Sequence, residues 1–208
     1  MSGIQQALFI HSASTQPGVW SINSGVSTWT LSNSDKTVTV PSSTDQGTAL
    51  CSVTQSTGKR YWEVLLGGTG ITSGLPFQPS LGIGNAAFAS GVANALLGST
   101  SDGWGFTSDG RILHSASALV TGLGTHAAGQ VLIFAVDLST LKWWVGRNGT
   151  WAAGGNPGAG TGEQATISGS APYCIGFTSN GVDETGTLRT VTADFSYSPP
   201  SGFIGWTE

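Results

Sequence analysis

The chain has 208 residues, a length that suits one domain with room for a sizeable core. Glycine, serine and threonine make up 84 of these residues, whereas only 18 are charged, and the formal net charge is −4. Helical domains use more Glu, Lys, Arg, Leu and Ala, so this composition favours many short strands and turns. No basic run occurs, which argues against nucleic-acid binding because that depends on clustered Lys and Arg.

Membrane spans, export signals and cysteine frameworks find no support in the sequence. No apolar stretch approaches the ~20 residues that a membrane span needs. The N-terminus has no positively charged segment, so we expect neither a secretory signal nor membrane insertion. Cys51 and Cys174 are too few for a disulfide framework or a zinc site. Their apolar surroundings predict two buried free thiols, and a single bridge between them is the open alternative.

Residues 1–18 differ in composition from the rest of the chain. They hold an apolar patch at 7–10 and a polar stretch that ends at Pro17-Gly18. The segment is either a first edge strand or an arm that docks on a partner, and the side chains available for docking are Ile4, Leu8, Phe9 and Ile10. We therefore divide the chain into this segment (1–18) and one β domain (19–208).

From residue 19 onwards, short strands alternate with turns. The segment 86–97 comes closest to a helix, but Gly91 interrupts it and no strong cap precedes it, so no helix is expected. About a dozen strands at turn spacing predict an all-β fold of two antiparallel sheets packed face to face. The predicted strands are 28–31, 37–40, 49–53, 60–66, 81–84, 103–107, 111–114, 131–136, 141–145, 165–167, 173–177 and 188–195.

The stretch 129–151 predicts a β-hairpin followed by a second tight turn. Residues 131–136 form a continuous apolar run, which is typical of a strand buried on both faces. Residues 137–140 supply the first turn, the chain returns over 141–145, and Asn148-Gly149 is a pair that tolerates positive φ.

Two adjacent tryptophans on the returning strand are predicted to lie on opposite faces. Lys142 and Trp144 share one face, whereas Trp143 shares the other with its apolar neighbours. Because a lysine is seldom fully buried, we expect Trp143 in the core and Trp144 on an outer face. An outward tryptophan is a first indication of a binding surface.

Five segments follow one another along the chain: GKRYWEV at 58–64, LGIG at 81–84, GWGF with SDG at 103–110, the hairpin 129–138 with its closing Asn-Gly at 145–149, and Pro172-Tyr173 with 191–195. In this order they resemble the SPRY family. The resemblance covers roughly residues 25–203 and implies a bent antiparallel β-sandwich of the concanavalin-like jelly-roll type. It also implies a role in binding a protein or peptide, not in catalysis, with the ligand set by variable loops.

A narrower resemblance concerns two later segments. KWWVGRNGTW at 142–151, with the loop that follows to Gly162, is similar to SPRY-like domains of tailed-bacteriophage structural proteins. The ending 195–203, which contains Tyr-Ser-Pro-Pro-Ser-Gly-Phe, is similar to them as well. The resemblance implies that the protein is a part of a virion.

No catalytic, metal or cofactor site is predicted. No two carboxylates alternate on one strand as paired acids for glycoside hydrolysis would, and the three histidines are isolated. We expect Glu63 to accept hydrogen bonds from a neighbouring strand or loop and Asp137 to cap its turn. The loop acids at positions 102, 109, 183 and 184 form no compact calcium-binding cluster in the sequence.

Tryptophans near turns are the stronger candidates for a binding site. Exposed tryptophans stack on sugars or anchor protein partners, and the alternative is that they close the open ends of the sandwich. We select Trp144 with Trp151 as the principal pair, supported by Lys142, Arg147 and Asn148. Trp104 is a third candidate ring, and Trp20 and Trp206 also lie beside turns.

These observations lead to three functional hypotheses. The first is a non-enzymatic accessory protein of a tailed-phage virion, present in several copies, which decorates the head or tail or contacts the host surface. Its partners are other virion proteins and, on the host, a glycan; it is assembled in the host cytoplasm. The second is a stand-alone lectin-like module that recognises glycans through Trp144, Trp151 and Trp104. The third is a glycan-cleaving hydrolase, which requires two close carboxylates in a groove.

Overall fold

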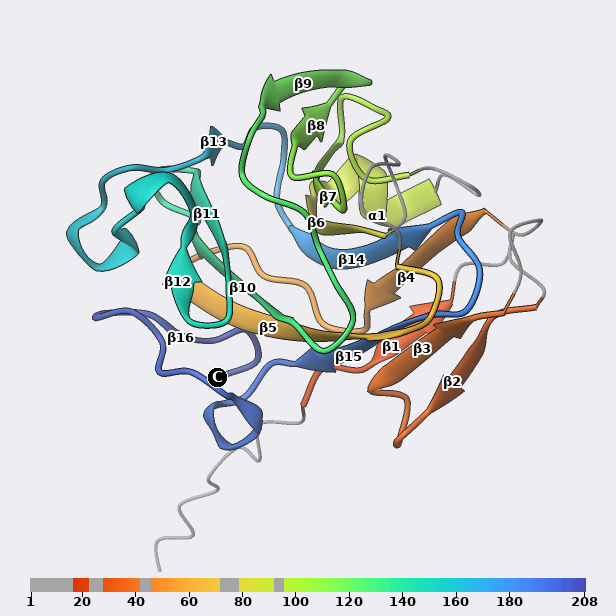
Figure 1. Ribbon diagram of the computed structural model, residues 1–208. Coiled ribbons are helices and arrows are strands. Elements are labelled where there is room, and N and C mark those ends of the chain that lie inside the picture. The colour runs from red at the N-terminus through yellow and green to blue at the C-terminus, as the bar shows by residue number, and fades with distance from the viewer. Residues whose placement is uncertain (1–16, 23–27, 42–45, 72–78, 92–95) are drawn as a thin grey trace, which may run out of the picture.

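Two β-sheets packed face to face make up the fold (Figure 1). The computed structural model describes residues 17–22, 28–41, 46–71, 79–91 and 96–208. The predicted docking residues Ile4, Leu8, Phe9 and Ile10 lie outside this described part. Within it, the predicted all-β sandwich is confirmed, and the strand pairs are antiparallel except for one short parallel pair.

The first sheet has the strand order β1-β4-β14-β6-β7-β8-β9. The second has the order β12-β11-β10-β5-β15-β3-β2, with β13 paired to β11 and β16 paired in parallel to β5. The first comprises β1 (Trp20–Ile22), β4 (Gly47–Cys51), β14 (Cys174–Ser179), β6 (Ser80–Gly84), β7 (Gly103–Thr107), β8 (Ile112–His114) and β9 (Ser117–Val120). The second comprises β12 (Thr150–Trp151), β11 (Lys142–Arg147), β10 (Val131–Asp137), β5 (Lys59–Gly68), β15 (Glu184–Arg189), β3 (Thr37–Val40), β2 (Thr30–Ser32), β13 (Ala165–Thr166) and β16 (Ile204–Gly205).

Aromatic rings from β5, β10 and β11 form the centre of the core between the sheets. Trp62 stacks on Phe134 with ring centroids 5.1 Å apart, and Phe134 stacks in turn on Trp143 at 6.1 Å. Trp143 is fully buried, which confirms its predicted place in the core. Offset aromatic contacts of this kind add about 0.5–1.5 kcal/mol each to the stabilisation from burial.

The expectation that the chain forms no helix is wrong for one short segment. Helix α1 spans Ala86–Gly91 and lies against the first sheet, where Phe88 packs with Leu97 and Cys174. The missing signal was Asn85, whose Oδ1 accepts hydrogen bonds from the backbone N–H groups of Ala87 (3.0 Å) and Phe88 (3.2 Å). Asparagine is among the strongest N-caps, and here it begins the helix directly after β6.

The predicted strand 188–195 is also wrong in its bounds. The strand is β15, Glu184–Arg189, and a 3-10 turn at Thr192–Asp194 follows it. Gly186 weakens the strand signal in the sequence, but the structure requires it because an added Cβ would lie 2.5 Å from the ring of Phe177. Two further 3-10 turns occur in the described part, at Ala152–Gly154 and Pro157–Ala159.

The outer face of the second sheet is divided into two halves. Over β5, β10 and β11 it carries a second apolar cluster, which includes Tyr61, Ile133, Trp144 and Phe203. Residues 195–203, which we call the C-terminal strap, contribute Phe195, Tyr197 and Phe203 to this cluster; Figure 1 shows the end of the chain in dark blue below β5. Over β15, β3 and β2 the outer face instead carries hydroxyl side chains.

Those hydroxyl side chains form two rows across three strands. Alternate residues of a strand point to the same face. On β3 and β15 the residues that point inward include Val38, Val40, Gly186 and Leu188, so the threonines between them point outward. The register aligns Ser32 with Thr37 and Thr187 in one row, and Thr30 with Thr39 and Thr185 in the other. Threonine suits such a half-covered pleated surface because of its branched Cβ.

The N-cap of α1 leads to a stability prediction. Replacing Asn85 by Ala removes both cap hydrogen bonds, so the free energy of unfolding should fall by about 1 kcal/mol or slightly more. Urea denaturation followed by tryptophan fluorescence measures the change. Ser90→Ala, at the exposed end of the same helix, is the control and should change stability by less than about 0.5 kcal/mol. Equal losses in the two variants would contradict the capping role.

Candidate functional site

Trp144 lies on the predicted face of β11 but is not exposed. It points away from Trp143 as the strand alternation requires, yet none of its surface is accessible. Its indole N–H donates to the carbonyl of Thr161 at 2.9 Å, and the ring of Phe203 lies against it at right angles. The expectation of an outward, exposed Trp144 is therefore wrong, because the C-terminal strap and the loop before β13 cover this half of the sheet.

The other tryptophans selected from the sequence are mostly buried too. Trp104 belongs to the first sheet and stacks on His114 with ring centroids 4.3 Å apart, so it does not lie beside Trp144. Trp20 and Trp206 are also buried, and each indole N–H donates to a carbonyl, of Gly186 and Val53 respectively. Trp151 alone of this set is half-buried, edge-on to Tyr61. Trp20, Trp104 and Trp206 belong to the core between the sheets, whereas Trp144 and Trp151 belong to the outer apolar cluster.

The three polar residues selected with them are bound to neighbouring loops. Lys142 donates to the carbonyl of Gly160 at 2.9 Å and pairs with Glu163 at 3.2 Å. Arg147 donates to the carbonyls of 123–125 and lies over the ring of Phe106. Asn148 has a positive φ of 47° and accepts a hydrogen bond from the backbone N–H of Val131 at 2.9 Å. Their role in binding stays a prediction, and the structure gives each of them a structural task.

Glu63 accepts hydrogen bonds from a neighbouring strand and from a loop, as the sequence predicts. Its fully buried carboxylate accepts from the backbone N–H groups of Ser196 and Tyr197 and from the hydroxyl of Tyr61, each at 2.8 Å. Arg189 on β15 donates a further hydrogen bond to it at 3.0 Å. Burial, reinforced by the adjacent Glu63 charge, raises the pKa of Tyr61 well above its usual range, which keeps the phenol a donor.

Asp137 and the cysteines also behave as the sequence predicts. The Asp137 carboxylate caps its turn by accepting from the backbone N–H and the hydroxyl of Ser139 at 3.0 and 2.6 Å. Cys51 and Cys174 are buried free thiols, so the alternative of a bridge between them is wrong. Burial raises the pKa of each thiol to about 12, which leaves no thiolate for chemistry at neutral pH.

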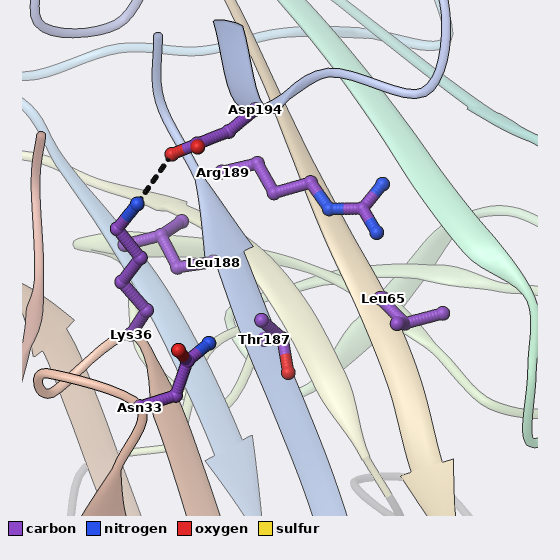
Figure 2. A pocket seen from close by; sticks show the side chains of 7 residues that line it. All are labelled: Asn33, Lys36, Leu65, Thr187, Leu188, Arg189 and Asp194. Carbon is purple, nitrogen blue, oxygen red and sulfur yellow. Dashed lines mark hydrogen bonds and ion pairs between the residues drawn. The ribbon is translucent and has the colours of Figure 1, made fainter.

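An open hollow of ≈ 410 Å³ lies where the covered and uncovered halves of the outer face meet. In Figure 2, Lys36 and Asp194 meet at one side of it, Arg189 extends along another, and Thr187 lies between them. The Lys36 ammonium is 2.6 Å from the Asp194 carboxylate, and both side chains are about a quarter exposed. The hollow is lined by Asn33, Lys36, Leu65, Thr187, Leu188, Arg189 and Asp194.

The turn that supplies Asn33 and Lys36 has an unusual backbone. Asn33, Ser34 and Asp35 follow one another with φ values of 54°, 52° and 62°, a left-handed conformation that non-glycine residues seldom adopt in succession. The surrounding backbone fixes the turn: Trp20 N–H donates to Asp35 O at 2.8 Å, and Leu188 N–H donates to Lys36 O at 2.8 Å. Strained segments held in this way cluster at binding sites. No residue of the turn Asn33–Lys36 was predicted from the sequence to be a contact residue.

Comparisons with known proteins address the fold. No protein-family model matches the chain, and no curated protein matches it. The crystal structure of the SPRY domain of human HERC1 superposes with a TM-score of 0.60 at 14% identity, covering 81% of this chain and 97% of that one. The fold is SPRY-like.

Two further structures agree with this result. The TRIM65 PSpry domain gives a TM-score of 0.55 at 15% identity, over 82% of this chain and 91% of its own. The stonustoxin structure gives 0.56 at 15% identity, over 82% of this chain and 27% of its own length. These likenesses confirm the SPRY-like fold predicted from five segments. The narrower phage resemblance stays a prediction.

The described part of this SPRY-like chain holds neither a candidate metal cluster nor a membrane-spanning helix. There, no three or more His, Cys, Asp or Glu side chains gather as a metal site would require. Among the described residues, no helix is long and apolar enough to cross a membrane.

Two buried titratable groups have opposite effects on the stability of this SPRY-like sandwich. His126 packs against Phe106, and neither of its ring nitrogens is hydrogen-bonded to a described residue; burial, together with the nearby Arg147, lowers its pKa to about 3. Glu184 is also buried, the described residues offer its carboxylate only the Ser179 hydroxyl, and burial raises its pKa to about 7. Histidine ordinarily titrates near 6.5 and glutamate near 4.5.

Between about pH 4.5 and 6.5 the two contributions should cancel in the wild-type protein. Here the unfolded chain binds the His126 proton that the folded state excludes, so this group makes stability fall as the pH falls. The folded state holds a Glu184 proton that the unfolded chain releases, so this group makes stability rise as the pH falls. Each slope is on the order of 1 kcal/mol per pH unit.

Single variants should reveal the two slopes. Over that pH range, urea denaturation should show that Glu184→Gln loses stability as the pH falls, whereas His126→Leu gains it. The double variant is the control and should be as flat as the wild type. Parallel pH profiles in the two single variants would contradict the assignment.

The Glu63 contacts predict how the C-terminal strap is held. Glu63→Gln keeps the size of the side chain but removes the charge that four donors share, so unfolding should become easier by about 2–3 kcal/mol. If the strap loosens, Trp144 beneath it becomes accessible, so acrylamide should quench the summed tryptophan fluorescence more strongly in this variant. A strap that stays as protected as in the wild type would show that its apolar contacts alone hold it.

Proposed function

We propose that this SPRY-like domain is a non-enzymatic binding module and that the hollow is its contact site. The observation that carries the proposal is the pairing of a rigid, strained turn with a set of charged and polar side chains that face open space. Binding residues on a loop that a stable sheet holds in place are a common arrangement for recognition. Two strands, β5 and β15, and two turns converge here, although they are far apart in the sequence.

The state of the nearby carboxylates favours binding over glycan cleavage. Glycoside hydrolysis uses one carboxyl group as an acid and a second as a base or nucleophile. Glu63, the partner of Arg189, accepts hydrogen bonds from four donors, and Asp194 at the rim of the hollow is paired with Lys36. Such pairing holds a carboxylate in one position, which suits the frame of a binding site.

We further propose that the protein is an accessory component of a tailed-phage virion, present in several copies on the head or tail. Support comes from the two segments that resemble phage SPRY-like domains, 142–162 and 195–203. They are not independent in the fold: Phe203 packs on Trp144, and a Cβ on Gly149 would lie 2.6 Å from the ring of Tyr197. The shared segments are therefore two halves of one packing unit.

Co-sedimentation tests this role. Particles produced by the genome that encodes the chain, purified on a density gradient, should contain it in several copies that mass spectrometry can count. Failure to find the chain in intact particles, while it is present in the lysate, would overturn the virion role.

Removal of residues 2–16 extends the same test to the docking segment. The cut ends before Gly18, because the Gly18 N–H donates to the Thr190 hydroxyl at 2.7 Å. The shortened protein should keep its melting temperature and be lost from the particles. Unchanged incorporation would remove the docking role of Ile4, Leu8, Phe9 and Ile10.

A further inference from the structure

We propose that the hollow binds one neutral sugar unit of a glycan. This proposal deepens the binding function and rests on the hollow being the contact site. It places glycan recognition away from Trp144, Trp151 and Trp104, at the β2–β3 turn and the end of β15. Four features of the hollow support this assignment: charge balance, unused hydrogen-bonding groups, a fixed frame and adjoining space.

The charges around the hollow are balanced in pairs. Lys36 is opposed by Asp194 at 2.6 Å, and Arg189 is opposed by Glu63 at 3.0 Å. A phosphate or carboxylate ligand would have to compete with these carboxylates for both cations. A neutral polyol has no such competitor, because its hydroxyl groups donate and accept hydrogen bonds without separating either pair.

Several polar atoms at the hollow remain unused among the contacts of the described residues. The side-chain amide of Asn33, Oδ1 of Asp194 and Nη2 of Arg189 make no hydrogen bond there. Together they offer amide, guanidinium and carboxylate groups, which can bridge neighbouring hydroxyls on a sugar ring. Leu65, on the adjacent strand, adds an apolar surface for the C–H face of the ring.

The frame of the hollow is already formed without a ligand. The left-handed turn places Asn33 and Lys36 on one side, and its backbone is bonded to β1 and β15. Thr187 is held by a 2.8 Å hydrogen bond between its hydroxyl and that of Thr37. Because little ordering remains to be done, weak hydrogen bonds to a small polar ligand can yield measurable affinity.

The surface beside the hollow has room for further sugar units. The hollow's ≈ 410 Å³ lies within the range of small-ligand sites, about 300–1,000 Å³. Thr187 also belongs to the first hydroxyl row of the outer face, which continues through Thr37 to Ser32. A glycan chain leaving the hollow in this direction would meet the hydroxyl groups of Thr37 and Ser32.

The experiment uses the full chain and a pair of matched variants. Asn33→Gly removes the amide and relieves the positive φ, so it should fold at least as well as the wild type. Ser34→Gly, at the next position of the same turn, makes the same backbone change at an exposed residue that does not line the hollow. A third variant, Thr187→Val, removes one lining hydroxyl at constant shape.

The probes are neutral mono- to tetrasaccharides built from hexoses and N-acetylhexosamines, the same series with sialic or uronic acids, inorganic phosphate, and a random peptide library. Calorimetry measures affinity, and the NMR signals of the Asn33 side-chain amide report contact directly. We expect at least one neutral saccharide to shift those signals. Asn33→Gly and Thr187→Val should weaken its binding by tenfold or more, and Ser34→Gly by less than twofold.

Three outcomes would overturn the sugar proposal in different ways. Binding only of acidic sugars or phosphate would show that the hollow recognises an anion, and selection of peptides that shift the same amide would show a peptide site. In both cases the binding function stands and only the ligand class falls. No response of the Asn33 amide to any probe would overturn the contact site itself. The virion role is decided separately, by co-sedimentation.

Discussion

The buried carboxylate of Glu63 is the constraint on which the outer face of the second sheet depends. A charged group placed on a strand and shielded from water is strongly destabilising unless donors surround it. Here the donors are the hydroxyl of Tyr61 on the same strand, the guanidinium of Arg189 on β15 and two backbone amides of the C-terminal strap. Satisfying Glu63 therefore requires the strap to lie across β5, and the strap then covers Trp144.

The same contacts explain where the hollow lies. Glu63 draws Arg189 towards the strap, and the 3-10 turn at Thr192–Asp194 brings Asp194 within reach of Lys36. Beyond that ion pair the strap no longer covers the sheet, so the outer face changes from aromatic packing to hydroxyl rows. The hollow, with its two ion pairs, therefore lies at this border because Glu63 holds the strap across β5.

Much of the framework was predictable because it depends on local patterns. Alternation placed Trp143 and Trp144 on opposite faces, and the turn chemistry of Asp137 and Asn148-Gly149 determined the ends of the central hairpin. Helix α1 also depends on a local signal, since Asn85 caps it, and the helix was not predicted because Asn85 was not recognised as its N-cap. The bounds of β15 were harder to predict, because Gly186 is required by a contact with the ring of Phe177 in the other sheet, which the sequence does not show.

By itself, the sequence determined the β architecture and the face to which each strand residue points, because both follow from spacing along the chain. The SPRY-like fold was implied separately, by the resemblance of five segments to that family. Only the tertiary structure decided what covers each face. Trp144 is buried by Phe203, and Lys36 meets Asp194 although 158 positions separate them. Strand periodicity states the direction of a side chain but not its surroundings. The prediction of an exposed tryptophan pair therefore failed at Trp144, which is fully buried. The polar hollow that we propose instead corresponds to no motif in the sequence.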